Sequence, residues 1–240
     1  MKRLALAIAR ENRGHPGLIG IARQSNQGLA ILHQAAPDDI RTPSLETLQD
    51  YASTLAALHA RETILPLRFG SIHESERDLD DWLRVHADEW RAQLDAVDDC
   101  DEMGLRVLID PPAERSDPPP AINADRPGTS YLQALKARHD RSDATRAEAD
   151  RMADWLRDSL GPTYRQSVSE PPGPGRERLL SMTFLVPRPQ LNQFRAATQP
   201  LTIALPGRII LTGPWPPYHF TDRAAVATQD SGRNNGKICC

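Results

Sequence analysis

The chain of 240 residues is 39% hydrophobic and 25% charged, the composition of a soluble protein with one large core or two modest ones. Its formal net charge of −3 argues against a nucleic-acid-binding protein, because such proteins usually present a basic face. No apolar run approaches the roughly 20 residues of a membrane span, and the N-terminal apolar run stops too early for a signal peptide. We therefore expect a cytoplasmic protein without a membrane segment.

The first hundred residues predict a small antiparallel sheet. Apolar stretches at residues 3–9, 18–22 and 29–33 are separated by turn signals rich in Gly and Asn, and they predict a three-stranded meander. Residues 63–72 predict a further strand. Because proline cannot donate to a sheet, Pro66 restricts that strand to an edge, a strand start or a bulge.

Two helices are predicted beside this sheet from apolar residues at steps of three and four. The first runs from its N-cap Ser44 to about Arg61, and the second runs from residue 74 or 75 to about Val97. His86 falls on the apolar stripe of the second helix. We expect it to be a core histidine whose ring is satisfied by its neighbours.

The other face of the second helix is strongly acidic. Between Glu74 and Glu102, twelve acidic residues outnumber three basic ones, which gives a local charge of −9. A basic partner would fit such a face, but acidic helix faces are more often simply solvated. We therefore interpret this face as solvated.

The remainder of the chain predicts a ferredoxin-like domain. The successive segments are a strand at 102–110, a long helix at about 131–159, strands at 164–168 and 179–186, a short helix from Pro189, and strand-like residues at 201–205 and 208–212. Their order is strand, helix, strand, strand, helix, strand, which is the split βαβ arrangement. The predicted fold class is α+β with two domains, a small antiparallel sheet with two helices followed by the ferredoxin-like domain.

The order of the elements places the domain boundary near Cys100 and not at the proline-rich segments, the first of which becomes an insertion in the second domain. We predict an N-terminal domain at 1–99, a ferredoxin-like domain at 100–221 with a proline-rich insertion at 111–127, and a disordered tail at 222–240. An alternative places the strand 102–110 in the sheet of the first domain and the linker at 111–127.

The three cysteines predict no disulfide framework. Cys239 and Cys240 are adjacent, and Cys100 lies among acidic residues, so a reducing compartment is expected. The terminal pair also lacks the C-a-a-X arrangement of a prenylated chain, and we expect a solvated tail there.

No pattern in the chain predicts catalysis, a metal or a cofactor. Motifs of the P-loop, dinucleotide-binding, nucleophile-elbow and HExxH types are absent, and the seven histidines are scattered. His59 and His73 flank one predicted strand, so a contact between this pair is the one to expect. We give that pair little weight as a functional site. We predict no catalytic, metal-binding or cofactor-binding residue.

Two short segments are candidates for partner binding or for a structural role. In Arg68-Phe69-Gly70 the arginine lies at a strand end, where it would bind an anion or a partner, or pair with a carboxylate such as Glu102 while Gly70 makes a tight exit. The second segment, Gly213–Phe220, carries three prolines and three large aromatic residues on a stiff backbone, so it is either a docking surface or a cover over the core. The candidate residues are Arg68, Phe69, Gly70, Trp215, Pro217, Tyr218 and Phe220.

Several stretches taken together resemble the gas vesicle protein GvpF/GvpL family. The blocks are LPLRFGSI at 65–72, EMGLRV at 102–107, Tyr131-Leu132, FLVPR at 184–188 and GPWPPYHF at 213–220. Their order and spacing over roughly residues 4–221 carry the resemblance. The chain departs from it modestly, with Ser71 where threonine is common and Arg106 where lysine is common.

This resemblance implies an accessory protein of gas vesicle assembly and not an enzyme. It implies binding to the small hydrophobic shell protein GvpA and to other Gvp proteins, which would prevent aggregation of the shell protein or aid nucleation. It also implies a two-domain α+β fold and carries over no catalytic or metal-binding residue. The resemblance does not separate GvpF from GvpL.

Two other function classes compete with this interpretation. A ferredoxin-like small-ligand or regulatory binding module would have a polar pocket lined by Arg68 or Arg106. An enzyme of other chemistry would need polar groups clustered in a cleft.

Overall fold

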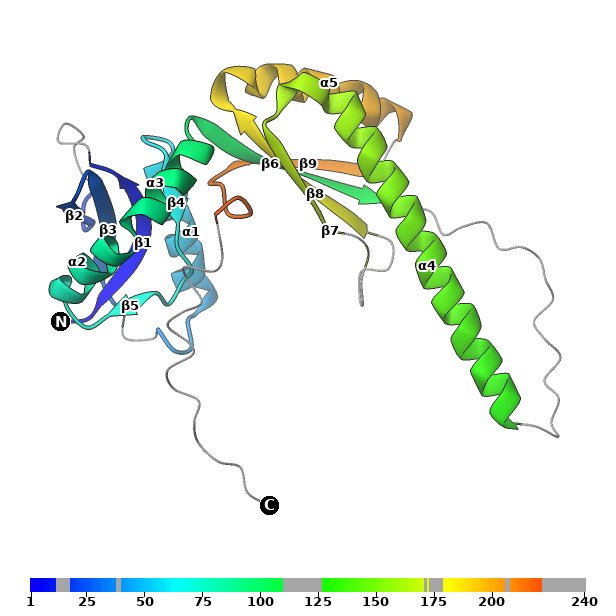
Figure 1. Cartoon of the computed structure of the whole chain (residues 1–240), viewed down its shortest axis with the longest axis horizontal. Helices are drawn as coiled ribbons and strands as arrows, with labels where there is room; N and C mark the ends of the chain where they lie inside the picture. The colour runs from blue at the N-terminus through cyan, green and yellow to red at the C-terminus, as the bar shows by residue number, and fades with distance from the viewer. Residues whose placement is uncertain are drawn as a thin grey trace. The chain divides into compact units, whose positions relative to one another are not determined.

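A computed structural model describes residues 1–11, 18–37, 40–109, 127–170, 172, 179–205 and 208–221. The predicted tail at 222–240 and nearly all of the predicted insertion at 111–127 lie outside these residues. Within the described residues the chain packs into two compact units, one made of Met1–Glu102 together with residues 214–221, and the other made of Met103–Gly213 (Figure 1). The last described segment therefore packs with the N-terminal residues.

The first unit is built on a five-stranded antiparallel sheet. Its strands are β1 (Arg3–Arg10), β2 (Ala22–Asn26), β3 (Leu29–Ala35), β4 (Ile64–Pro66) and β5 (Ile72–His73). The order is β2-β3-β1-β4, and β5 also pairs with β1. Because successive residues of a strand point to opposite faces and every residue from Leu4 to Ala9 is buried, both faces of β1 are covered.

The predicted three-stranded meander is wrong in its order and in its second strand. β1 pairs with β3 and not with β2, and the second strand begins at Ala22, where the predicted strand 18–22 ends. Gln27 and Gly28 both have positive φ, 53° and 80°, and this two-residue turn joins β2 directly to β3. The most apolar strand, β1, then takes the central position. Of the three positions that Pro66 allowed, an edge, a strand start or a bulge, the structure shows an edge, since β4 ends the strand order.

Three helices cover this sheet, and not the two that were predicted. They are α1 (Leu45–His59), α2 (Glu76–Val85) and α3 (Ala87–Ala96). The predicted N-cap is confirmed, because Ser44 Oγ accepts a hydrogen bond from the Thr47 amide at 3.0 Å.

The predicted second helix is divided at His86, whose φ of −106° and ψ of 13° leave the helical region. Its ring packs beside the contacting pair Trp82 and Trp90, with centroids at 6.0 and 5.3 Å, so packing of the ring accompanies the break. His86 is only half-buried, and its Nδ1 lies 3.4 Å from Glu89 Oε2. The expectation of a core histidine is therefore correct for its ring contacts and wrong for its burial.

The second unit has the predicted ferredoxin-like order. It comprises β6 (Cys100–Leu108), α4 (Pro127–Leu160), β7 (Gln166–Glu170), β8 (Leu179–Pro187), α5 (Leu191–Ala204) and β9 (Ile209–Trp215), with short 3-10 turns at Gly161–Thr163 and Arg188–Gln190. The sheet order is β7-β8-β6-β9. Because β6 lies inside this sheet, the alternative that placed strand 102–110 in the first sheet is wrong. The long helix α4 is continuous through residues 140–143 and extends beyond the strands (Figure 1).

One face of the second sheet forms the core of this unit. On β6, Met103, Leu105 and Val107 are buried, whereas Arg106 and Leu108 are exposed, as the alternating sequence predicts. The same core contains Phe184 from β8 and Phe194 from α5.

Residues 201–205 were expected to be strand-like, but Leu201 lies in the last turn of α5. Phe194, Thr198 and Leu201 are all buried, and their spacing of four and three is helical.

The predicted domain boundaries stay a prediction. The packing divides the chain between Glu102 and Met103 and again after Gly213. Packing contacts define a compact unit, whereas a domain is a part of the chain that can fold independently. The predicted boundaries at residues 99 and 221 concern independent folding, which the packing does not test.

Candidate partner-binding site

Two segments that stand far apart in the sequence meet in the first unit. One is the aromatic loop, Leu67–Ser71, between β4 and β5. The other is the strap, Pro216–Phe220, which follows β9. Phe69 from the loop and Tyr218 from the strap both pack against a cluster that includes Leu6, Tyr51 and Leu55.

The aromatic loop is fastened to β1 at both ends. The Leu67 amide donates to the Leu6 carbonyl at 2.9 Å, and the Ala5 amide donates to the Ser71 carbonyl at 2.9 Å. Between these points Gly70 has a φ of 93°, a conformation that residues with a Cβ rarely adopt. The glycine therefore makes the tight exit from β4 possible.

Tyr51 of α1 holds the middle of the same loop. Its hydroxyl donates to the Leu67 carbonyl at 2.7 Å, and its ring meets Phe69 edge to face with centroids 5.1 Å apart. Burial raises the pKa of Tyr51, so the hydroxyl keeps its proton and remains a donor. Tyr51 was not among the predicted candidate residues, because its helical spacing alone does not indicate a bond to the loop.

The strap is held by its prolines, its tyrosine and a buried carboxylate. Pro216 and Pro217 are buried, and Tyr218 is half-buried against the cluster. The His219 amide donates to Glu102 Oε2 at 2.8 Å, and His219 Nδ1 lies 2.7 Å from Glu102 Oε1. An ionised carboxylate can only accept, so Nδ1 carries the hydrogen of this second bond.

The carboxylate of Glu102 also affects its surroundings. Burial, and then the charge of Glu102, raise the pKa of Tyr218, which therefore stays a neutral phenol at ordinary pH. Glu102 itself is 4% exposed, and a buried carboxylate is tolerated only when donors satisfy it. His219 supplies two such donors.

Arg68 does not pair with Glu102 as the sequence suggested. Its side chain is exposed, and within the part of the chain that the structure describes no carboxylate forms an ion pair with it. Glu102 is instead bonded by His219. Arg106 lies in the second unit, where it is exposed and its Nη1 donates to Ser181 Oγ at 3.2 Å.

The predicted site residues fall into two groups by exposure. Arg68 and Trp215 are exposed, and Trp215 has 49% of its surface accessible. Phe69, Tyr218 and Phe220 are half-buried, and Pro217 is buried. The first group is available to a partner, and the second group holds the loop and the strap in place.

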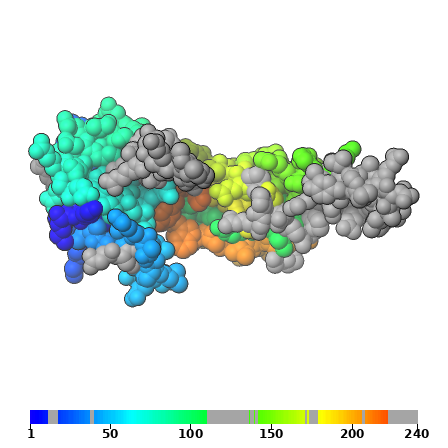
Figure 2. All heavy atoms as spheres, turned by 90° about the horizontal axis from the view of Figure 1, so that it is seen from below, coloured from blue at the N-terminus to red at the C-terminus, as the bar shows by residue number. Residues whose placement is uncertain are grey.

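An exposed apolar stripe on α1 was not predicted as a surface. Leu45 is 72% exposed and Leu48 is 40% exposed, and Ala52 and Ala56 continue the same helix face. Side chains of α1 lie on the surface of the first unit in Figure 2, in light blue. The helical spacing of these leucines helped to predict α1, but a helical stripe alone does not show which part of it is covered.

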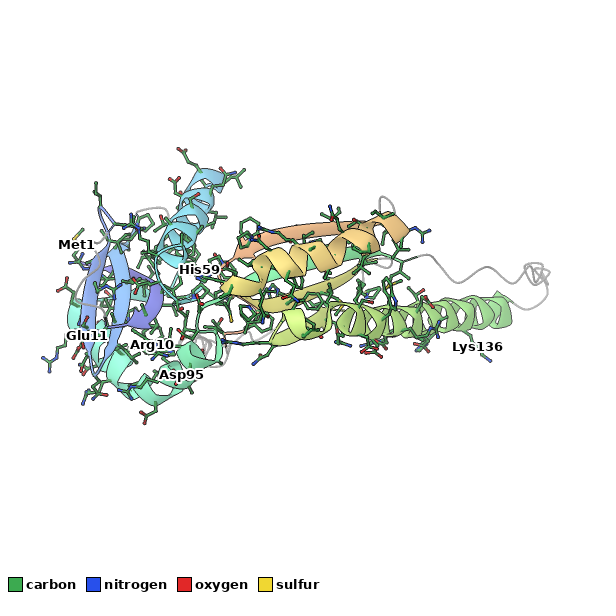
Figure 3. All side chains as sticks on the ribbon, turned by 90° about the horizontal axis from the view of Figure 1, so that it is seen from above. Met1, Arg10, Glu11, His59, Asp95 and Lys136 are labelled. Carbon is green, nitrogen blue, oxygen red and sulfur yellow. The ribbon has the colours of Figure 1, made fainter. Side chains whose placement is uncertain are left out.

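In the described part of the chain, His59 and His73 pack in separate surroundings. His59 Nε2 lies 2.7 Å from Asp101 Oδ1 in a buried pair at the end of α1, whereas His73 packs on Trp82 with centroids 4.8 Å apart (Figure 3). Among the described residues no group of three or more His, Cys, Asp or Glu could hold a metal ion.

Arg10 at the end of β1 forms an ion pair with Asp95 of α3, and the two side chains point toward one another in Figure 3. This surface pair links the sheet to its helical cover.

Within the described ranges no helix is both long and apolar enough to cross a membrane.

Comparison with known proteins identifies relatives along most of the chain. The family model of the gas vesicle synthesis protein GvpL/GvpF matches residues 12–222. Gas vesicle protein L of Streptomyces sp. (strain CB03234) is 29% identical over 215 residues, which cover 82% of this chain and 80% of that protein. Gas vesicle protein F of the same organism is 28% identical over 207 residues, which cover 81% of this chain and 84% of that protein.

Solved structures share the fold. GvpF from Microcystis aeruginosa superposes with a TM-score of 0.73 at 13% identity, covering 92% of this chain and 99% of that chain. GvpF from Anabaena sp. PCC7120 superposes with a TM-score of 0.67 at 16% identity, covering 92% of this chain and 98% of that chain. The chain belongs to the gas vesicle synthesis protein GvpL/GvpF family.

Proposed function

We propose that this chain is an accessory protein of gas vesicle assembly that acts by binding and not by catalysis. Its partners are the hydrophobic shell protein GvpA and other Gvp proteins, which it meets in the cytoplasm at forming gas vesicles. Binding keeps the shell protein from aggregating or aids nucleation. Membership of the GvpL/GvpF family is the observation that supports this role.

The partner surface that we propose lies on the first unit. Trp215 is 49% exposed directly before the strap, and tryptophan is among the residues that most often dominate binding energy. Arg68 adds an exposed guanidinium on the aromatic loop. Phe69 and Tyr218 support it, because they pack the loop and the strap against the cluster, and Gly70 makes the tight exit of the loop. Pro217 and Phe220 contribute through the hydrogen bond that joins them within the strap.

Capture of GvpA by purified variants tests this proposal. Trp215→Ala removes an exposed side chain, so we expect GvpA capture to weaken at least about tenfold, the scale of a binding hot spot, while the melting temperature stays unchanged. Tyr218→Ala should reduce both capture and stability, because the strap loses its contact with the cluster. Ile203→Ala on the second unit, where Ile203 is 76% exposed, is the matched control and should capture GvpA normally.

Two results would contradict the proposal at different levels. If Trp215→Ala captures GvpA as well as the unaltered chain does, the surface is elsewhere. If the unaltered chain captures neither GvpA nor another Gvp protein, the binding function itself is wrong.

A further inference from the structure

The strap is docked like a peptide ligand and not like a strand. Its two prolines have no amide hydrogen, and the amides of Tyr218 and Phe220 donate inside the strap, to the Pro216 carbonyl at 2.8 Å and the Pro217 carbonyl at 3.3 Å. The remaining amide, of His219, donates to the Glu102 side chain. The strap therefore folds on itself and binds the first unit through side chains and one carboxylate.

The surface beneath the strap, which we call the seat, suits a proline-rich aromatic segment. We define it as the hydrophobic cluster around Tyr51, against which Tyr218 packs together with Phe69 and Ile72, and Glu102, which accepts the bonds from His219. Prolines have few conformations to lose on binding, and aromatic-lined surfaces recognise proline-rich segments for this reason. The buried Pro216 and Pro217 match that mode.

Glu102 gives the seat its direction and specificity. Its two oxygens accept separate bonds from the amide and the ring of His219, at 2.8 and 2.7 Å. Bonds to an ionised acceptor are roughly twice as strong as neutral ones. A ligand for this seat therefore needs two donors placed as His219 places them, next to an aromatic residue and two prolines.

We propose that the strap and its seat form a peptide-recognition site, and that the seat accepts the strap of a second copy of this chain as well as its own. A second copy is the occupant that fits, because its strap carries the same prolines, the same aromatic ring and the same two donors that the seat binds. Gly213 lies in β9, three residues before the strap, and its φ of 106° is a conformation that residues with a Cβ rarely adopt. Such an exchange of identical elements is a low-cost route to association.

Connection within one chain keeps the exchange rare in dilute solution. Because the strap belongs to the same chain as its seat, its effective concentration there exceeds that of a strap supplied by another molecule in dilute solution, so the outside strap competes poorly. Weakening the strap of the host chain, or crowding many copies together, removes this advantage. The proposal is independent of GvpA binding and survives if that function is wrong.

A labelled peptide of residues 213–221, titrated into the full chain and followed by fluorescence anisotropy, tests the proposal. His219→Ala in the chain weakens the internal strap, so we expect the peptide to bind this variant at least about tenfold more tightly than the unaltered chain. Tyr218→Ala weakens the strap at a different contact and should give the same result. A peptide of the same composition in scrambled order should not bind.

Removing the acceptor provides the specific control. Glu102→Gln added to the His219→Ala chain should reduce peptide binding at least tenfold, because an amide replaces one acceptor with a donor. Circular dichroism must show that each variant is folded. The proposal is overturned if the folded His219→Ala and Tyr218→Ala chains bind the peptide no better than the unaltered chain, or if the scrambled peptide binds equally well.

Discussion

The two units complete their cores in different ways. The main cluster of the second unit, from Met103 to Ile209, lies in one uninterrupted part of the chain. The cluster of the first unit joins residues near the N-terminus to Tyr218, which follows the whole second unit in sequence. The second unit can therefore be derived from the order of its elements, whereas the first depends on a contact that closes a very long loop.

The largest effect that tests this contrast is expected in the second unit. Phe184→Ala removes a ring with 0% exposure that packs on Tyr164 and Phe194, at centroid distances of 4.9 and 5.4 Å. We expect a loss of about 3–5 kcal/mol in the free energy of unfolding, measured by urea denaturation. Ile203→Ala, at an exposed position of the same unit, should change it by less than about 0.5 kcal/mol. A small effect of Phe184→Ala would mean that this core is loosely packed.

A smaller effect is expected where two strands of the second sheet approach closely. A Cβ placed on Gly104 would lie 2.5 Å from Thr212 Oγ1, so Gly104→Ala forces the threonine to move. We expect a cost of about 1–3 kcal/mol. Thr212→Ala removes the atom that clashes, so the double variant should recover most of this loss in a double-mutant cycle. Strict additivity of the two changes would refute the clash.

A comparable effect is expected where the first unit fastens its aromatic loop. Tyr51→Phe keeps the ring contact with Phe69 but removes the donor to the Leu67 carbonyl. Leaving that buried carbonyl without its donor should cost about 1–3 kcal/mol of stability. Hydrogen exchange should increase at the Leu67 and Ala5 amides, which tie the loop to β1, and amides of the second unit should be unaffected. Faster exchange throughout the chain would contradict a local role for Tyr51.

The smallest effect is a pH dependence that belongs to the first unit. The ordinary pKa of histidine is 6.5. Burial lowers the pKa of His33 below this value, and the charge of Arg3 lowers it further. Burial likewise lowers the pKa of His73, and His33 lowers it further. Below that value the unfolded chain binds more protons than the folded one. The stability is therefore complete above about pH 6.5 and falls as the pH decreases, by at most about 1.4 kcal/mol per pH unit for each histidine.

Urea denaturation at several pH values between 7.5 and 5 measures this dependence. Trp82 and Trp90, which lie in α2 and α3 of the first unit, contribute a fluorescence signal from that unit. His73→Gln should flatten the dependence relative to the unaltered chain, whatever its effect on the absolute stability. An equally steep dependence in this variant would exclude His73 as a cause.

Local patterns were sufficient for much of the fold. The alternation of Met103, Leu105 and Val107 with exposed neighbours predicted β6, and Ser44 predicted the start of α1, because both signals act within a few residues. The strand order of the second unit followed from the order of its elements. The division at His86 and the helical end of α5 at Leu201 were missed, since there tertiary packing outweighs local preference.

The sequence predicted only part of the candidate site. Phe69, Gly70 and Tyr218 were selected from their unusual local composition. Their seat was not, because the bonds between Glu102 and His219 join residues on either side of the entire second unit. No local pattern could indicate that this glutamate serves the strap and not Arg68.

By itself the sequence determined most of the elements, the ferredoxin-like order and the resemblance to the family, since these depend on periodicity and on the spacing of short blocks. Only the tertiary structure decided that β1 lies beside β3, that Tyr51 holds the aromatic loop, and that the strap packs with the N-terminal residues. The physical reason is that hydrophobic burial and hydrogen bonding select among many distant partners of similar chemistry. The partner that the fold selects is the one that satisfies a buried polar group, such as the Glu102 carboxylate.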